Sequence, residues 1–93
     1  MTRDMLFVAR AEALAVSTWS AGEHLDRARA DAVIRDALLA HGGVRGCAAA
    51  LAQRFGDYPE TTATRMGRAR IAVRVLYERP GRPLTGDRAA AAA

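Results

Sequence analysis

Residues 43–79 constrain the fold most, because they hold two helical patterns joined by a short turn. Small side chains dominate the first pattern, from 44 to 55, and Pro59 opens the second at a position where proline favours the start of a helix. We therefore predict helices over 44–55 and 59–79, with a turn between them. The second pattern places its apolar side chains on one arc of a helical wheel: Ala63, Met66, Ala69, Val73, Leu76 and Tyr77.

Two further helices precede this stretch. The first is expected over residues 4–17 and is apolar nearly all round, which is typical of a helix buried on more than one side. The second is expected to begin at a capping box, Ser20 with Glu23 three residues later, and to end before Gly42. The chain shows no strand pattern. We predict an all-α fold, a small bundle of four helices.

The second helix carries two patterns at helical spacing. Charges of alternating sign at steps of four predict an exposed ladder of ion pairs on one side: Glu23, Arg27, Asp31 and Arg35. Apolar residues predict a core stripe: Ala30, Val33, Ile34, Ala37 and Leu38. Trp19, just before this helix, is expected to anchor the core between helices.

Length and composition limit the size of the core. The chain has 93 residues, of which 51% are apolar, but 22 of those 47 apolar residues are alanine. Alanine buries little area, so a single small domain over residues 1–79 is expected to be marginal alone, and dimerisation is an ordinary remedy. Residues 80–93 contain proline, glycine and a terminal alanine run, and are expected to form a disordered tail.

The distribution of charge is more informative than its amount. All 14 basic residues are arginine, a bias typical of GC-rich coding, so arginine abundance alone is not evidence for phosphate recognition. Residues 1–40 hold five arginines against six acids, whereas residues 41–93 hold nine arginines against four acids. A basic half beside a near-neutral half favours one face that meets an anionic partner.

The sequence gives no support for catalysis or for membrane insertion. His24, His41 and the single Cys47 show no metal-ligand spacing, and no glycine-rich phosphate loop follows a strand. We therefore expect no enzyme, no catalytic residues, no metal and no cofactor. The lone cysteine fits a reducing compartment, and no apolar run is long enough to span a bilayer, so a cytoplasmic protein without a membrane partner is expected.

The segment 51–56 resembles the helix-turn-helix superfamily of DNA-binding proteins. Ala52 matches the small residue of the family's first helix, and Phe55 with Gly56 matches the apolar residue and turn glycine that follow. The family then expects apolar residues six and nine positions after the glycine. Those positions hold Thr62 and Arg65, whereas apolar residues stand one position later, so the turn is expected to be one residue longer. The resemblance covers about 25 residues.

The resemblance implies that the predicted helix over 59–79 is a recognition helix lying in the major groove of double-stranded DNA. With its apolar arc inward, the candidates for base edges are Thr61, Thr64 and Arg65. The candidates for phosphates are Arg68, Arg45 and Arg54. The implied function is a small DNA-binding transcriptional regulator, expected to be a homodimer that pairs through its first helix.

An alternative is a helical protein–protein interaction module without nucleic-acid binding, such as an adaptor, an antitoxin-like partner or a dimeric regulatory partner. The first helix, apolar nearly all round, and the small volume of the core favour this alternative. The concentration of basic charge after residue 40 and the lack of acids across 61–74 favour DNA binding.

Overall fold

The computed structural model describes residues 3–78 and confirms the all-α fold: the described chain has four α-helices and a final π-helical turn, and no strand. The predicted tail over 80–93 lies outside these residues. The elements are α1 (Arg3–Val16), α2 (Arg27–His41), α3 (Val44–Asp57), α4 (Pro59–Val73) and the π turn η1 (Arg74–Glu78).

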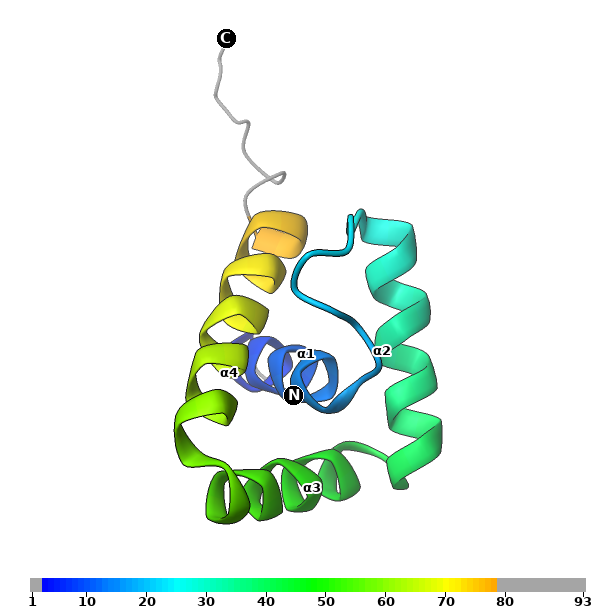
Figure 1. Ribbon diagram of the computed structural model, residues 1–93. Helices are drawn as coiled ribbons and strands as arrows, with labels where there is room; N and C mark the ends of the chain where they lie inside the picture. The colour runs from blue at the N-terminus through cyan, green and yellow to red at the C-terminus, as the bar shows by residue number, and fades with distance from the viewer. Residues whose placement is uncertain (1–2, 79–93) are drawn as a thin grey trace, which may run out of the picture.

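Helix α1 lies at the centre of the fold and packs against the other three helices (Figure 1). In that view α2 and α4 lie on either side of it and α3 crosses below. The C-terminal half of α1 is buried apart from its charged residues Arg10 and Glu12, and its buried residues include Ala11, Leu14 and Val16. The predicted burial on more than one side therefore holds for this half. The N-terminal half exposes Met5, Leu6 and Val8.

Each outer helix contributes a buried stripe to one core around α1. The stripe predicted for α2 is confirmed, with Leu38 half-buried, and Trp19 is buried as expected. Cysteine here acts as a small apolar side chain, and burial raises the pKa of the Cys47 thiol. The buried residues outside α1 are Trp19, Ala30, Val33, Ile34, Ala37, Cys47, Leu51, Thr62, Met66, Ala69 and Val73.

Helix α2 begins at Arg27, so the predicted start at Ser20 is wrong. Ser20 and Glu23 do interact, because Glu23 N donates to Ser20 O over 2.9 Å and Ser20 N donates to Glu23 Oε1 over 3.4 Å. These bonds close a single turn that does not continue. Asp26 caps the helix instead, since its Oδ1 accepts from Arg29 N over 2.8 Å and satisfies an otherwise free donor.

The predicted charge ladder on α2 does not form. Glu23 lies before the helix and pairs with Arg29 over 3.0 Å, and Arg35 lies 3.7 Å from its neighbour Asp36. Arg27 and Asp31, the other two members, contact Tyr77 of η1 instead. Helical spacing therefore did not decide the partners of these four residues.

Tyr77 ties η1 to α1 and α2. Its hydroxyl donates to Asp31, and the guanidinium groups of Arg10 and Arg27 lie 4.0 and 4.7 Å from the centre of its ring. Burial and the Asp31 carboxylate raise the pKa of Tyr77 to about 12. The tyrosine is thus held as a neutral donor between two cations.

The junction between α2 and α3 depends on glycine. Gly42 and Gly43 both have positive φ, 81° and 94°, and Gly43 N donates to Leu38 O over 2.7 Å to cap α2. One turn later, Gly46 packs so closely that a Cβ there would overlap the carbonyl oxygen of His41. Among the described glycines, only Gly46 lies this close to another helix.

The junction between α3 and α4 is different from the one that the resemblance implies. Helix α3 continues through Gly56 to Asp57, Gly56 has no positive φ, and Gly56 and Ala52 are both exposed. Ala52 and Gly56 therefore do not take the places of a small residue packed between the helices and a left-handed turn glycine. Tyr58, with φ −140°, separates the two helices, and Pro59 opens α4 as predicted.

Candidate nucleic-acid interface

The inward face of α4 includes Thr62 rather than the predicted Ala63. Thr62 is only 6% exposed and its Oγ1 donates to Arg54 O over 3.0 Å, whereas Ala63 is exposed. The buried Thr62 hydroxyl has a hydrogen-bond partner in this carbonyl of the last turn of α3. A polar residue can therefore be buried at a position where an apolar one was expected. The predicted shift of register to Ala63 is therefore wrong, although Met66, Ala69 and Val73 are buried as predicted.

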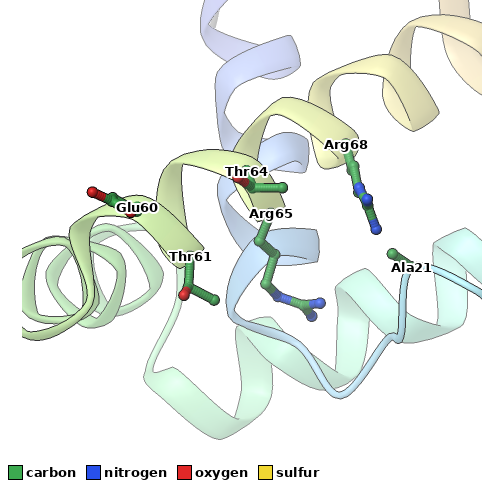
Figure 2. A pocket seen from close by; sticks show the side chains of 6 residues that line it. All are labelled: Ala21, Glu60, Thr61, Thr64, Arg65 and Arg68. Carbon is green, nitrogen blue, oxygen red and sulfur yellow. The ribbon is translucent and has the colours of Figure 1, made fainter.

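The outward side of α4 carries Thr61, Thr64 and Arg68, all exposed. Helical spacing places these three residues on one stripe that continues through Ile71 and Val75, which are 62% and 47% exposed. Thr61, Thr64 and Arg68 border an open hollow of about 470 Å³ with Arg65, Glu60 and Ala21, the last from the segment between α1 and α2 (Figure 2).

Arg65 lies at the inner edge of this hollow and holds the end of α1. Its Nε donates to Ala15 O over 2.5 Å, and its Nη2 donates to Ser17 O over 2.9 Å and to Leu14 O over 3.4 Å. Burial, and then the nearby charge of Arg54, lower the pKa of Arg65, which still remains a cation. The Nε and Nη2 donors of Arg65 are used within the fold, so Arg65 positions α4 against the end of α1, and only its Nη1 remains for the base-edge contact predicted.

Arg54 reaches the same carbonyl as Arg65. Its Nη1 donates to Ala15 O over 3.4 Å, so two guanidinium groups converge on the C-terminus of α1. The negative end of a helix dipole favours cations at this place. Neither arginine forms an ion pair with a carboxylate within residues 3–78.

The structure does not bring all six predicted DNA-binding residues together. Thr61, Thr64, Arg65 and Arg68 border one hollow, and Arg54 is the neighbour of Arg65. Arg45 is exposed in the first turn of α3, at the end away from α4. A helix of this length separates its two ends by about 20 Å, so Arg45 belongs to another part of the surface.

Sequence reasoning missed the link between α1 and the arginines of α3 and α4. One signal was present: α1 has no basic residue in its last turn, and no glycine follows it. Ser17 caps only Leu14 O, through its N and Oγ, so the carbonyl of Ala15 needs a partner from elsewhere, and Arg54 and Arg65 provide it. Nothing in the sequence, however, indicates which of its 14 arginines would do so.

Charge is distributed unevenly along α4. Glu60 stands in its first turn, where a carboxylate stabilises the positive end of a helix, and Figure 2 shows its side chain directed away from Arg65 and Arg68. Further along, Arg68, Arg70 and Arg74 are exposed, and no acid occurs across 61–74. The outer surface of α4 beyond its first turn is therefore cationic.

Residues 3–78 contain no cluster of three histidine, cysteine or acidic side chains that could hold a metal, and none of their helices is long and apolar enough to cross a membrane. Comparisons with models of protein families, with curated proteins and with solved structures find no match to this chain.

Proposed function

We propose that the outer face of α4 binds double-stranded DNA and that the protein is a small transcriptional regulator of the cytoplasm. The observation that carries this proposal is the placement of Thr61, Thr64 and Arg68 together on one exposed face, in a helix without acids across 61–74. Two hydroxyls and a guanidinium at successive turns suit phosphate oxygens and the edges of bases.

The contacts of the predicted residues lead us to assign them different roles in the proposal. Arg68 is exposed without a protein partner among the described residues, so we assign it to phosphate contact, and we keep Thr61 and Thr64 as candidates for bases. Arg65 and Arg54 orient α4 against α1. The helix resembles a recognition helix in carrying Thr61 and Thr64, its candidates for bases, in its N-terminal half.

Fluorescence polarisation with duplex DNA at several salt concentrations tests the proposal. Affinity should fall as salt rises, because binding releases counterions from the phosphates. The Arg68→Met variant should weaken binding about threefold to tenfold and reduce the salt slope by about one. Arg35→Met is the matched control, since Arg35 is 68% exposed on α2 and lies away from this face; its affinity should stay within about twofold.

Two results would contradict DNA binding by this face. One is the lack of any binding at low salt. The other is an equal loss of affinity in Arg68→Met and Arg35→Met, which would indicate attraction by net charge alone.

A second candidate is the helical protein–protein interaction module. It is favoured by large apolar side chains left exposed on α1, α2, α4 and η1: Met5, Val8, Leu39, Ile71 and Val75. If this candidate is correct, replacing Ile71 by Glu should abolish capture of a protein partner while Arg68→Met leaves it unchanged. DNA binding predicts instead that Arg68→Met weakens the binding of duplex DNA.

The homodimer belongs to the proposal as well. Val8 on the exposed N-terminal half of α1 borders an apolar hollow with Val44 of α3. A dimer through this face would place two α4 helices on one symmetric site. Light scattering should give a dimer mass at micromolar concentration, and Val8→Glu should convert it to a monomer. A monomer mass for the wild type across that range would exclude the dimer.

A further inference from the structure

Two adjoining hollows lie along the N-terminal half of α4. The first has a volume of about 150 Å³ and lies between the end of α1, α3 and α4, with Ala15, Leu51 and Tyr58 among its walls. The second is the open hollow beside Thr64 and Arg68. Both are lined by Thr61 and Arg65, so they meet at these two side chains.

The smaller hollow is apolar. Its walls are almost entirely carbon, because Arg54 and Arg65 direct their donors to the carbonyls of α1. A dry cavity of about this size in another protein accepts benzene. The hollow therefore suits a benzene-sized apolar group and offers little to a polar one.

The larger hollow is cationic. Arg68 and Arg65 border it with two threonine hydroxyls, and within residues 3–78 neither arginine has a carboxylate partner. Glu60 lines the same hollow, but Figure 2 shows its carboxylate pointing away from the guanidinium groups of both arginines. Donors of this kind bind a carboxylate strongly, through charge-assisted hydrogen bonds.

From this pairing we infer a binding site for an amphipathic organic anion. The ligand has a benzene-sized apolar body in the smaller hollow and one carboxylate in the larger, bound by Arg68 and Thr64 beside Arg65. Such a ligand occupies the proposed DNA face. Its competition with DNA at this face rests on the proposed function. The binding itself does not depend on DNA, so failure of one proposal leaves the other standing.

Phenylacetate is the probe, titrated into the full-length protein and followed by nitrogen–proton NMR spectra of the backbone and the arginine side chains. Saturable shifts are expected at Thr61, Arg65 and Arg68, with a Kd in the millimolar range for a ligand of about ten heavy atoms. Phenylacetamide, which has the same shape without the charge, and acetate, which lacks the ring, should each bind at least about tenfold more weakly.

Arg68→Met should raise the Kd for phenylacetate about tenfold, because one charge-assisted contact is lost. Arg70→Met is the matched control: it removes the same charge from an exposed site on α4 that borders neither hollow, and its Kd should stay within about twofold.

The inference is overturned if phenylacetate gives no saturable shift in the wild type, or if phenylacetamide binds as well. It is also overturned if Arg68→Met and Arg70→Met change the Kd equally. The comparison of the two ligands uses only the wild-type protein, so it does not depend on the folding of any variant.

Discussion

The two junctions that flank α3 are built by different means. Between α2 and α3 the backbone makes the contact: Gly42 and Gly43 are left-handed, and Gly46 packs against the carbonyl of His41. Between α3 and α4 side chains make the contact, through Thr62 on Arg54 O and through Arg54 and Arg65 on Ala15 O. The first junction is fixed by the absence of side chains, and the orientation of α4 at the second is set by polar groups.

The largest effect should come from Gly46→Ala. The added Cβ would overlap the backbone of His41, which cannot move without shifting the end of α2. We expect the free energy of unfolding to fall by more than about 3 kcal/mol in urea denaturation. A loss below about 1 kcal/mol would show that the two helices are not in close contact at this point.

The next effect concerns the junction built by side chains. Arg65→Met removes three hydrogen bonds to the end of α1 and should cost about 2 kcal/mol, measured in the same way. Arg70→Met removes an equal charge from the exposed surface of α4 and should change stability by less than about 0.5 kcal/mol. Equal losses in the two variants would contradict the positioning role of Arg65.

A smaller loss is expected for Gly42→Ala. Gly42 lies in open space, so only its positive φ of 81° opposes a side chain. The left-handed conformation costs an alanine about 1 kcal/mol relative to glycine. If the variant were as stable as the wild type, the left-handed cap of α2 would be wrong.

The smallest effect has the opposite sign. Gly56 lies within helix α3, its φ is not positive, and nothing lies near its missing Cβ. Gly56→Ala should therefore stabilise the protein by about 0.5 kcal/mol through helix propensity. A loss of 1 kcal/mol or more would instead indicate a left-handed turn residue, as the helix-turn-helix pattern expects.

These two junctions also show what the sequence could predict. Apolar spacing located all four helices and the core stripe of α2, because local periodicity records which side of a helix is buried. It failed at Thr62, whose polar side chain is buried because a carbonyl of α3 accepts its hydrogen bond. The capping-box prediction failed at Ser20, because Asp26 caps the helix instead and capping signals alone do not rank such alternatives.

The candidate site was predicted only in part for the same reason. Thr61, Thr64 and Arg68 follow from helical spacing, which separates the outward side of α4 from the core. Arg65 could not be assigned in this way, since its partners lie about 50 residues earlier, at the end of α1. Long side chains at the edge of a helix can serve either solvent or a neighbouring helix, and only the tertiary arrangement decides.

The central claim is that the outer face of α4 is the surface that meets DNA. NMR mapping of backbone amides during titration with a short DNA duplex tests it most directly. The account predicts that the largest shifts fall on Thr61, Thr64 and Arg68, with little change at Val8 and Val44 on the apolar hollow of α1 and α3. Shifts confined to Val8 and Val44, or no shifts at low salt, would contradict it.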